Sequence, residues 1–200
     1  MAQEAVSAQS EEVSMGVQLR VDGENLYMKT VEYLKVRNMP SDTAAATEFI
    51  VAKLGELVDS IEDRHGLRSE LGYYYMTSVG VDALRSRKML WGFKEQLREL
   101  GIEIVIVEKR NDKSGNIDPR LISDAYRLLL IERRAPSHLV LVCGDKDYEQ
   151  MLVDYEGQGR KVCVCFYQPA NGGASIDLLS IRGLEFIDFA NPEQSWMIPH

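Results

Sequence analysis

The sequence contains few of the residues that build zinc centres or disulfide frameworks. Among its 200 residues there are only three histidines and three cysteines. Cys143, Cys163 and Cys165 form no C-x-x-C pair and fall within apolar runs that we expect to be core strands. Cysteines in such runs are typical of small buried side chains in a reducing compartment, and zinc sites need more histidine or paired cysteine. We therefore expect a cytoplasmic protein without zinc or disulfides.

Long apolar runs are lacking too, since no stretch approaches the ~20 residues of a membrane-spanning helix. The start of the chain is polar and acidic, without the basic and apolar regions of a signal peptide. We expect no membrane partner. The pattern divides the chain into a disordered tail (1–15), one domain (16–190) and a C-terminal tail (191–200).

Basic residues are in the minority. The formal net charge of −8 argues mildly against a nucleic-acid partner, because neutralisation of phosphates by Lys and Arg drives most such binding. This objection weakens if part of the negative charge belongs to carboxylates that bind a divalent cation, because the cation reverses the local field.

Apolar strand-like runs alternate with segments of helical periodicity along the chain. Such alternation predicts an α/β fold of three layers, Rossmann-like, with a mostly parallel central sheet and helices on both faces. The expected strands are 17–21, 71–77, 102–107, 138–143, 162–167 and 185–189. The expected helices are 26–37, 44–64, 81–100, 119–133, 148–158 and 174–181.

Aspartates recur where such a fold brings together its ligand-binding edge. They are Asp22, Asp118, Asp124, Asp145 and Asp147. The first ends the strand-like run VQLRVD, and the last two follow HLVLVCG. Ligands of open α/β sheets bind beyond the carboxyl ends of the strands, and carboxylates gathered there repel one another unless a cation or a proton intervenes. Oxygen ligands suit Mg²⁺ or Mn²⁺, so the pattern predicts metal-dependent phosphate chemistry, a nuclease before other classes.

Each aspartate also has a purely structural interpretation. Asp145 can cap the helix that follows it, and Asp147 can favour the positive end of that helix. Asp118 before Pro119 is typical of a helix start, and Asp22 before Gly23 is typical of an Asx-turn.

Asp124 is harder to explain structurally, because it lies on or beside the helix face that packs on the sheet. A buried carboxylate needs a partner. A salt bridge to Arg120 or Arg127 is the structural alternative to a catalytic role.

Three motifs occur in the order found in one known family. They are VDGENL (Val21–Leu26), IDPRLISDA (Ile117–Ala125) and CGDKDY (Cys143–Tyr148), followed by Ser175 with Leu178 or Leu179. On these residues the chain resembles the NYN domains of the PIN-like nuclease superfamily, which include LabA-like bacterial proteins. The chain departs from the pattern at Cys143, where serine is usual, and at Lys113, which lies slightly upstream of its usual place.

The resemblance implies a PIN-like fold and cleavage of RNA phosphodiester bonds with Mg²⁺ or Mn²⁺. It implies metal ligands at Asp22, Asp118, Asp145 and Asp147, with Asp124 as a further catalytic carboxylate. A metal held in this way activates water and stabilises the charge of the transition state. Histidine-driven RNA cleavage is disfavoured, because no histidine is placed for acid–base work.

Substrate contacts are expected from a small set of polar residues. The set comprises Asn25, Lys113, Lys146 and Ser175. Tyr148 and the tyrosines at 73–75 are candidates for stacking on bases, although tyrosines that alternate along a strand are more often core residues.

The leading hypothesis is therefore a metal-dependent endoribonuclease with RNA as its partner. A catalytically weak or inactive NYN domain that binds RNA or protein is the main alternative, favoured by the acidic net charge. A phosphatase of HAD type is disfavoured, because its D-x-D motif comes first in the chain and here it comes late. Homo-oligomer formation is left open.

Overall fold

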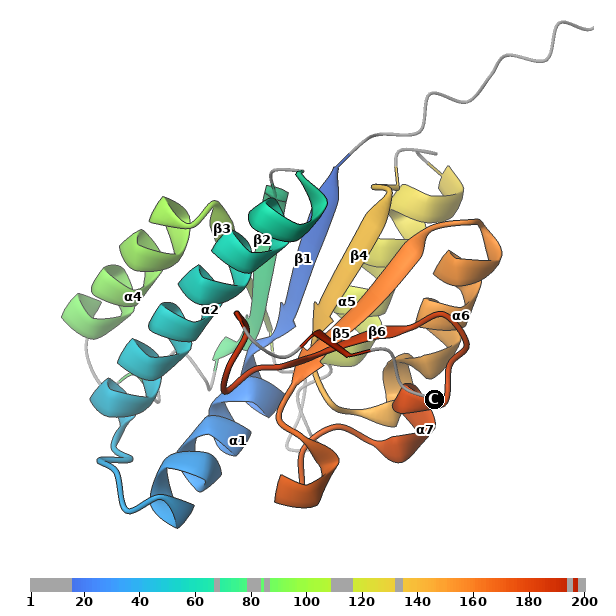
Figure 1. Cartoon of the computed structure of the whole chain (residues 1–200). Helices are drawn as coiled ribbons and strands as arrows, with labels where there is room; N and C mark the ends of the chain where they lie inside the picture. The colour runs from blue at the N-terminus through green and yellow to red at the C-terminus, as the bar shows by residue number, and fades with distance from the viewer. Residues whose placement is uncertain are drawn as a thin grey trace, which may run out of the picture.

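Six parallel strands and one antiparallel strand form a single sheet in the computed structural model of the chain (Figure 1). The structure describes residues 16–66, 69–78, 84, 87–108, 117–131, 135–193 and 196–197, so the predicted substrate contact Lys113 lies outside the described residues. The sheet order is β3-β2-β1-β4-β5-β6-β7. The strands are β1 (Val17–Asp22), β2 (Ser69–Thr77), β3 (Ile102–Val107), β4 (His138–Val142), β5 (Lys161–Phe166), β6 (Glu185–Asp188) and β7 (Trp196–Met197).

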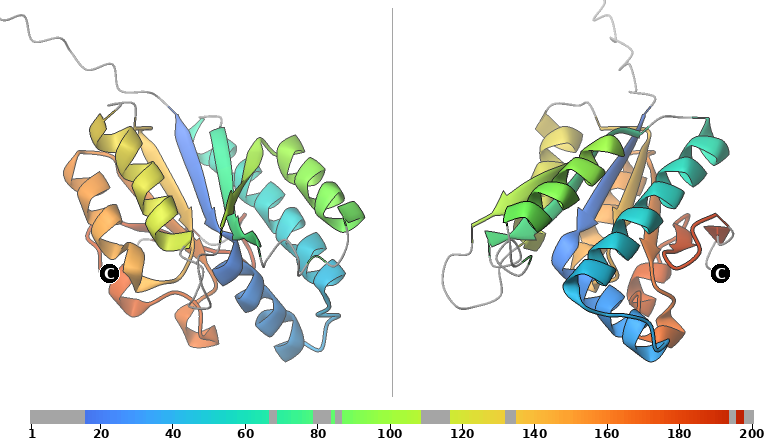
Figure 2. Two further views of the ribbon diagram at one scale, coloured as in Figure 1. Left: turned by 180° about the vertical axis from the view of Figure 1, so that it is seen from behind. Right: turned by 90° about the vertical axis from the view of Figure 1, so that its left-hand side faces the viewer.

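Helices cover both faces of this sheet (Figure 2). One face carries α1 (Gly23–Val36), α2 (Thr43–His65) and α4 (Arg87–Glu99), and the other carries α5 (Ile117–Tyr126) and α6 (Glu149–Gly157). The short α7 (Ile176–Leu179) lies between β5 and β6 in the chain. The predicted three-layer, Rossmann-like architecture is confirmed. Among the helices described, none combines the length and apolar character needed to cross a membrane.

The strand order reverses between β1 and β4. From β1 the chain builds β2 and β3 on one side and then crosses to β4 on the other. All six residues of β1 are buried, as expected for a central strand covered on both faces. Ligand sites of open α/β sheets lie at such a reversal, beyond the carboxyl ends of the strands. The aspartates that follow β1 and β4 are therefore brought to the same crevice.

The first helix begins earlier than the sequence predicts. Its start at Gly23 precedes the predicted start at Leu26, because Asp22 is the N-cap and its side chain accepts a hydrogen bond from the backbone N–H of Asn25 (3.0 Å). Gly23 is the first residue of the helix. A Cβ atom on Gly23 would lie 2.2 Å from the ring of Tyr74, so glycine is needed for the close contact between α1 and β2.

The predicted helix 81–100 and the predicted buried strand 102–107 both need correction. Leu84 lies in a turn, and α4 begins only at Arg87. β3 forms the edge of the sheet, and the Ile106 side chain is 53% exposed there. The run IEIVIV is as apolar as that of an inner strand. At the edge of the sheet, however, it has a neighbouring strand on one side only.

Two further differences from the predictions concern the start of α5 and the C-terminal tail. α5 begins at Ile117, so Asp118 lies in the first turn of the helix and is not its cap; the helix continues as a π-helical turn (Arg127–Ile131). Within the predicted C-terminal tail, the short β7 pairs antiparallel with β6. Two residues of strand give too little pattern to predict from sequence.

Candidate active site

Asp22 is the most deeply buried carboxylate at the crevice. Its side chain is 5% exposed. One oxygen, Oδ1, caps α1, and the other, Oδ2, lies 3.0 Å from the hydroxyl of Tyr148 and 3.7 Å from Sγ of Cys143. Burial, together with the negative charge of Asp118, raises the pKa of Asp22 to about 6, against hydrogen bonds from Asn25, Tyr148 and Cys143 that lower it. Asp22 is thus a carboxyl group that holds its proton more tightly than an exposed aspartate does.

Tyr148 joins the carboxylates of Asp22 and Asp118. It is fully buried, and its hydroxyl lies 2.6 Å from Oδ1 of Asp118 and 3.0 Å from Oδ2 of Asp22. Burial raises the pKa of Tyr148, and the two carboxylates raise it further, so the hydroxyl stays protonated. It has one proton and can donate to only one carboxylate. The second contact is favourable when Asp22 keeps a proton or when a cation lies beside the pair.

Asp145 lies beside these groups, after β4. It caps the 3-10 turn η2 (Lys146–Tyr148) by accepting a hydrogen bond from the backbone N–H of Asp147 (3.1 Å). The charges of Asp22, Asp145 and Asp118 all raise the pKa of the buried Cys143 thiol, although burial is the larger cause. The three carboxylates therefore lie within electrostatic reach of one sulfur atom.

Asp147 and Lys146 lie on the exposed side of η2. The backbone of Asp147 supports Asp145, but its side chain is exposed to solvent and does not join the Tyr148 hydrogen bonds that unite Asp22 and Asp118. The geometry of the D-x-D motif is therefore that of a capped turn, as its structural interpretation predicts.

Asp124 belongs to a different group of residues. Its Oδ2 accepts hydrogen bonds from Nε of Arg120 (2.9 Å) and from the hydroxyl of Tyr75 (3.3 Å). Tyr75 also accepts a hydrogen bond from Arg20, which is 1% exposed and further bonded to Gln18 (3.0 Å). The salt-bridge interpretation of Asp124 is the one the structure shows, and it links the outer surface of α5 to a cation buried in the sheet.

Asn25 lies in the first turn of α1, and Ser175 is the N-cap of α7. Oδ1 of Asn25 is buried and has no hydrogen-bond partner among the described residues. Such an oxygen needs a donor or a cation. Ser175 Oγ accepts a hydrogen bond from the N–H of Asp177 (3.2 Å) and caps α7, while its own N–H donates to the carbonyl oxygen of Gly144 (2.9 Å). Ser175 therefore ties α7 to the loop that carries Asp145.

The predicted set of four metal-binding aspartates is not assembled as a cage. In the part of the chain that the structure describes, no three His, Cys, Asp or Glu side chains form a group that could hold a metal ion. The reason is visible in the contacts: Tyr148 lies between Asp22 and Asp118, Asp145 faces its own turn, and Asp147 is exposed. Mg²⁺ is commonly held by one or two carboxylates with water and substrate phosphates completing its shell. Asp22 and Asp118, with the unpaired oxygen of Asn25, fit that kind of site.

The sequence interpretation gave Tyr148 a different role and missed Glu24. Tyr148 is a buried hydrogen-bond donor and does not offer the exposed ring needed for base stacking. Glu24 accepts a hydrogen bond from the buried hydroxyl of Thr77 at the end of β2. Glu24 could have been found from its place in the DGEN motif. The role of Tyr148 could not, because it depends on the packing of three separate elements.

The parallel sheet with helices on both faces is consistent with the fold of the PIN-like nuclease superfamily. Within it, the NYN domain family model matches residues 16–188. The chain belongs to the NYN domain family, and the resemblance expected from the three motifs is confirmed. A comparison with curated proteins gave no match.

Proposed function

We propose that the chain is a metal-dependent endoribonuclease whose reaction centre is the group formed by Asp22, Asp118 and Asp145. The observation that carries the proposal is the pair of carboxylates from β1 and α5 that meet at one buried hydroxyl, Tyr148. Carboxylates so close repel each other, and a divalent cation would relieve that repulsion. Membership of the NYN family supports the choice of phosphodiester chemistry.

Asp22 and Asp118 would hold Mg²⁺ or Mn²⁺, and Asp145 adds negative charge beside them. When bound, the ion activates water and stabilises negative charge on phosphate oxygens. Tyr148 orients Asp118 by donating a hydrogen bond, and a cation beside Asp22 would favour the ionised form of this buried carboxyl group. Asn25, whose backbone N–H donates to Asp22, has a buried side-chain oxygen without a hydrogen-bond partner among the described residues. The free thiols of Cys143, Cys163 and Cys165 fit the cytoplasmic location included in the proposal.

The test is cleavage of a panel of end-labelled single- and double-stranded RNAs in Mn²⁺, in Mg²⁺ and in EDTA. Wild type is compared with Asp118→Asn and with Asp177→Asn, an exposed carboxylate on α7 at the same end of the sheet. We expect metal-dependent cleavage by wild type and Asp177→Asn, and none by Asp118→Asn. Equal cleavage by all three proteins, or cleavage that persists in EDTA, would contradict the proposal.

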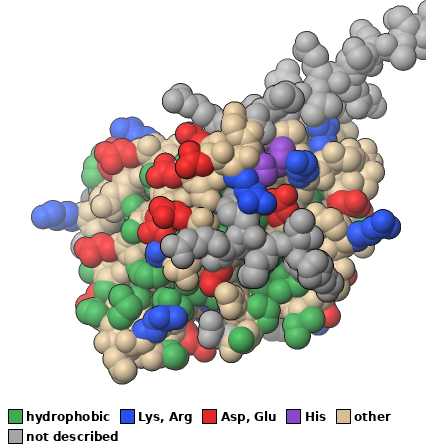
Figure 3. Space-filling view, viewed as in Figure 1, with side chains coloured by type: hydrophobic (Ala, Val, Ile, Leu, Met, Phe, Trp, Pro, Cys, Tyr) green, Lys and Arg blue, Asp and Glu red, His purple; other side chains and the backbone are tan. Residues whose placement is uncertain are grey.

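A second candidate is an NYN domain that binds RNA or protein without cutting. Two observations favour it: no three-ligand metal group occurs among the described residues, and the net charge is −8. On the face seen in Figure 3, acidic side chains mix with scattered Lys and Arg, and apolar side chains gather over the lower part, around α1 and α7. Intact RNA in every lane, together with a shift of the labelled RNA on a native gel, would select this function.

A further inference from the structure

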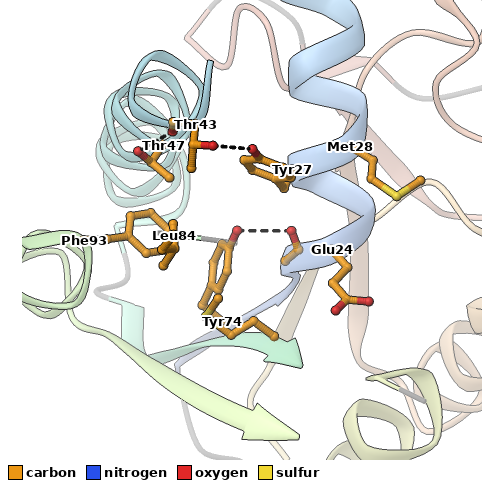
Figure 4. A pocket seen from close by; sticks show the side chains of 10 residues that line it. Glu24, Tyr27, Met28, Thr43, Thr47, Tyr74, Leu84 and Phe93 are labelled. Atoms are coloured by element: carbon orange, nitrogen blue, oxygen red, sulfur yellow. Dashed lines mark hydrogen bonds between the residues drawn. The ribbon is translucent and has the colours of Figure 1, made fainter. Parts of the chain in front are cut away.

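A cavity of about 200 Å³ lies behind the carboxylate site, on the other face of the sheet. It is bounded by α1, α2, α4 and the end of β2 (Figure 4). The lining is largely apolar and includes Tyr27, Thr47, Tyr74, Met76, Leu84 and Phe93.

Gly23 connects the cavity to the carboxylates. It directly follows Asp22, and it lines the cavity. Tyr74 and Tyr75 are neighbours on β2, and they point to opposite faces: Tyr74 packs edge-on against Phe93 of α4 (5.3 Å between ring centres), whereas Tyr75 reaches Asp124 of α5. The cavity and the carboxylate group are thus separated by the thickness of the sheet at one shared edge.

The size and lining of the cavity restrict its ligand. Drug-sized ligands and cofactors occupy pockets of ~300–1,000 Å³, so about 200 Å³ suits a single flat ring system. Three aromatic side chains line it, namely Tyr27, Tyr74 and Phe93. Aromatic walls of this kind bind bases that have been turned out of a single strand, by stacking on their π-faces.

The polar atoms of the lining already have partners. The Tyr27 hydroxyl donates to Oγ1 of Thr43 (3.2 Å), and the Tyr74 hydroxyl donates to the carbonyl oxygen of Gly23 (3.2 Å). Oγ1 of Thr47 donates back to its own helix (2.9 Å). In Figure 4 the Glu24 carboxylate points away from the rings of Tyr27 and Tyr74. The cavity therefore offers rings and apolar surface, which select for a base without distinguishing its edges.

We propose that this cavity binds one unpaired nucleobase of the RNA substrate, from a nucleotide next to the phosphate at Asp22 and Asp118. The proposal rests on the proposed function for its choice of RNA. It adds a site that holds the strand by base stacking, with little preference for one base over another. This would give an acidic chain a source of RNA affinity other than phosphate neutralisation.

The test uses the full chain labelled with ¹³C at its methionine methyl groups, in EDTA, so that cleavage plays no part. Met28 and Met76 line the cavity, and Met151 is buried in α6 on the other face and serves as the reference. The four nucleoside 5′-monophosphates are titrated in turn, with ribose 5-phosphate as the probe that lacks a base. Ring currents of a bound base should shift the Met28 and Met76 signals and leave Met151 in place.

Three variants make the test specific to the cavity. Thr47→Phe fills it, and Ala52→Phe places the same ring on the exposed side of the same helix. We expect the shifts to vanish in the first variant and to persist in the second. Tyr27→Leu, which keeps the bulk and removes one aromatic wall, should weaken nucleotide binding about tenfold, within the range measured for loss of base stacking; it decides the question if Thr47→Phe does not fold.

Unchanged Met28 and Met76 signals with all four nucleotides would overturn the proposal, as would equal shifts with ribose 5-phosphate. The proposed nuclease activity is judged separately. RNA cleavage together with unchanged methionine signals would support the nuclease and contradict the base site. Shifted methionine signals without cleavage in the RNA panel would support the base site and contradict the nuclease.

Discussion

The two faces of the sheet differ sharply at its carboxyl edge, although they are built from the same strands. On the α5 side, Asp22, Asp118 and Tyr148 form a buried polar group, and Arg20, Tyr75 and Asp124 form another. On the side of α1 and α2, an apolar cavity is lined by Gly23 and Tyr74, which are the chain neighbours of Asp22 and Tyr75. Alternation along a strand sends successive side chains to opposite faces, so one sheet edge carries both a charged site and a ring-sized apolar one.

The largest effect is expected from a substitution that changes the polar side alone. Asp118→Asn should reduce RNA cleavage by about 100-fold or more, because the interaction of a metal ion with the transition state contributes several kcal/mol. The same variant should leave nucleotide-induced shifts of Met28 and Met76 intact. The measurement is the initial cleavage rate at saturating Mn²⁺. A full cleavage rate in this variant would show that Asp118 does not belong to the reaction centre.

Gly23→Ala should disturb both sides together, since Gly23 belongs to both. The new Cβ would lie 2.2 Å from the Tyr74 ring and 2.5 Å from the carbonyl oxygen of Tyr75. Overpacking of this kind lowers the free energy of unfolding by ~1–3 kcal/mol. The control is Gly92→Ala in α4, where a Cβ meets nothing within 4 Å; a helical Gly-to-Ala change should stabilise by ~0.5–1 kcal/mol. Urea denaturation compares the two, and similar midpoints would show that the contact at Gly23 relaxes freely.

Stability should depend on pH through Asp22 on the polar side. Its pKa is about 6 in the folded chain, against an ordinary value of 3.8 for an aspartate in the unfolded chain. Between these values the folded state keeps a proton that the unfolded state has lost, so the free energy of unfolding falls as pH rises from about 4 to 6 and stays lower above that. The full loss is about 3 kcal/mol. Asp22→Asn should flatten this dependence and raise stability at pH 7; parallel curves for both proteins would contradict the assignment.

The smallest effect is expected for Tyr74→Phe, in a direct comparison with Tyr75→Phe. Tyr75→Phe leaves a buried arginine and a half-buried aspartate without their shared hydroxyl, which should cost ~1–3 kcal/mol. Tyr74→Phe removes one hydrogen bond, to the carbonyl oxygen of Gly23, and should cost about 1 kcal/mol. Chemical denaturation at pH 7 measures both. A larger loss in Tyr74→Phe would reverse the contrast between the two faces.

Much of the polar side was predictable because its signals are local. Asp22 ends the strand-like run VQLRVD, and the D-x-D motif follows the apolar run HLVLVC, so the sequence alone brings both to the carboxyl edge. Asp124 was ambiguous, because its partner Tyr75 is distant in sequence and only the packing of α5 on β2 brings them together. The edge position of β3 could not be derived either, since IEIVIV is the pattern of an inner strand.

The apolar side was not predictable at all. Its walls come from three helices and a strand, and no one of these segments has a distinctive sequence pattern. The close contact of Gly23 with Tyr74 has no signal in the sequence, because the register between β1 and β2 sets it. The bridging hydroxyl of Tyr148 depends in the same way on three elements meeting.

The double use of Asp22 has an evolutionary consequence. The same carboxylate caps α1 and stands in the proposed reaction centre, and asparagine is an equally good cap. A descendant that lost catalysis would still be selected to keep Asp or Asn here, because the helix depends on it. Asp118 caps no helix, so drift would erase it first. Among relatives of this chain, residue 118 is therefore the better indicator of surviving activity.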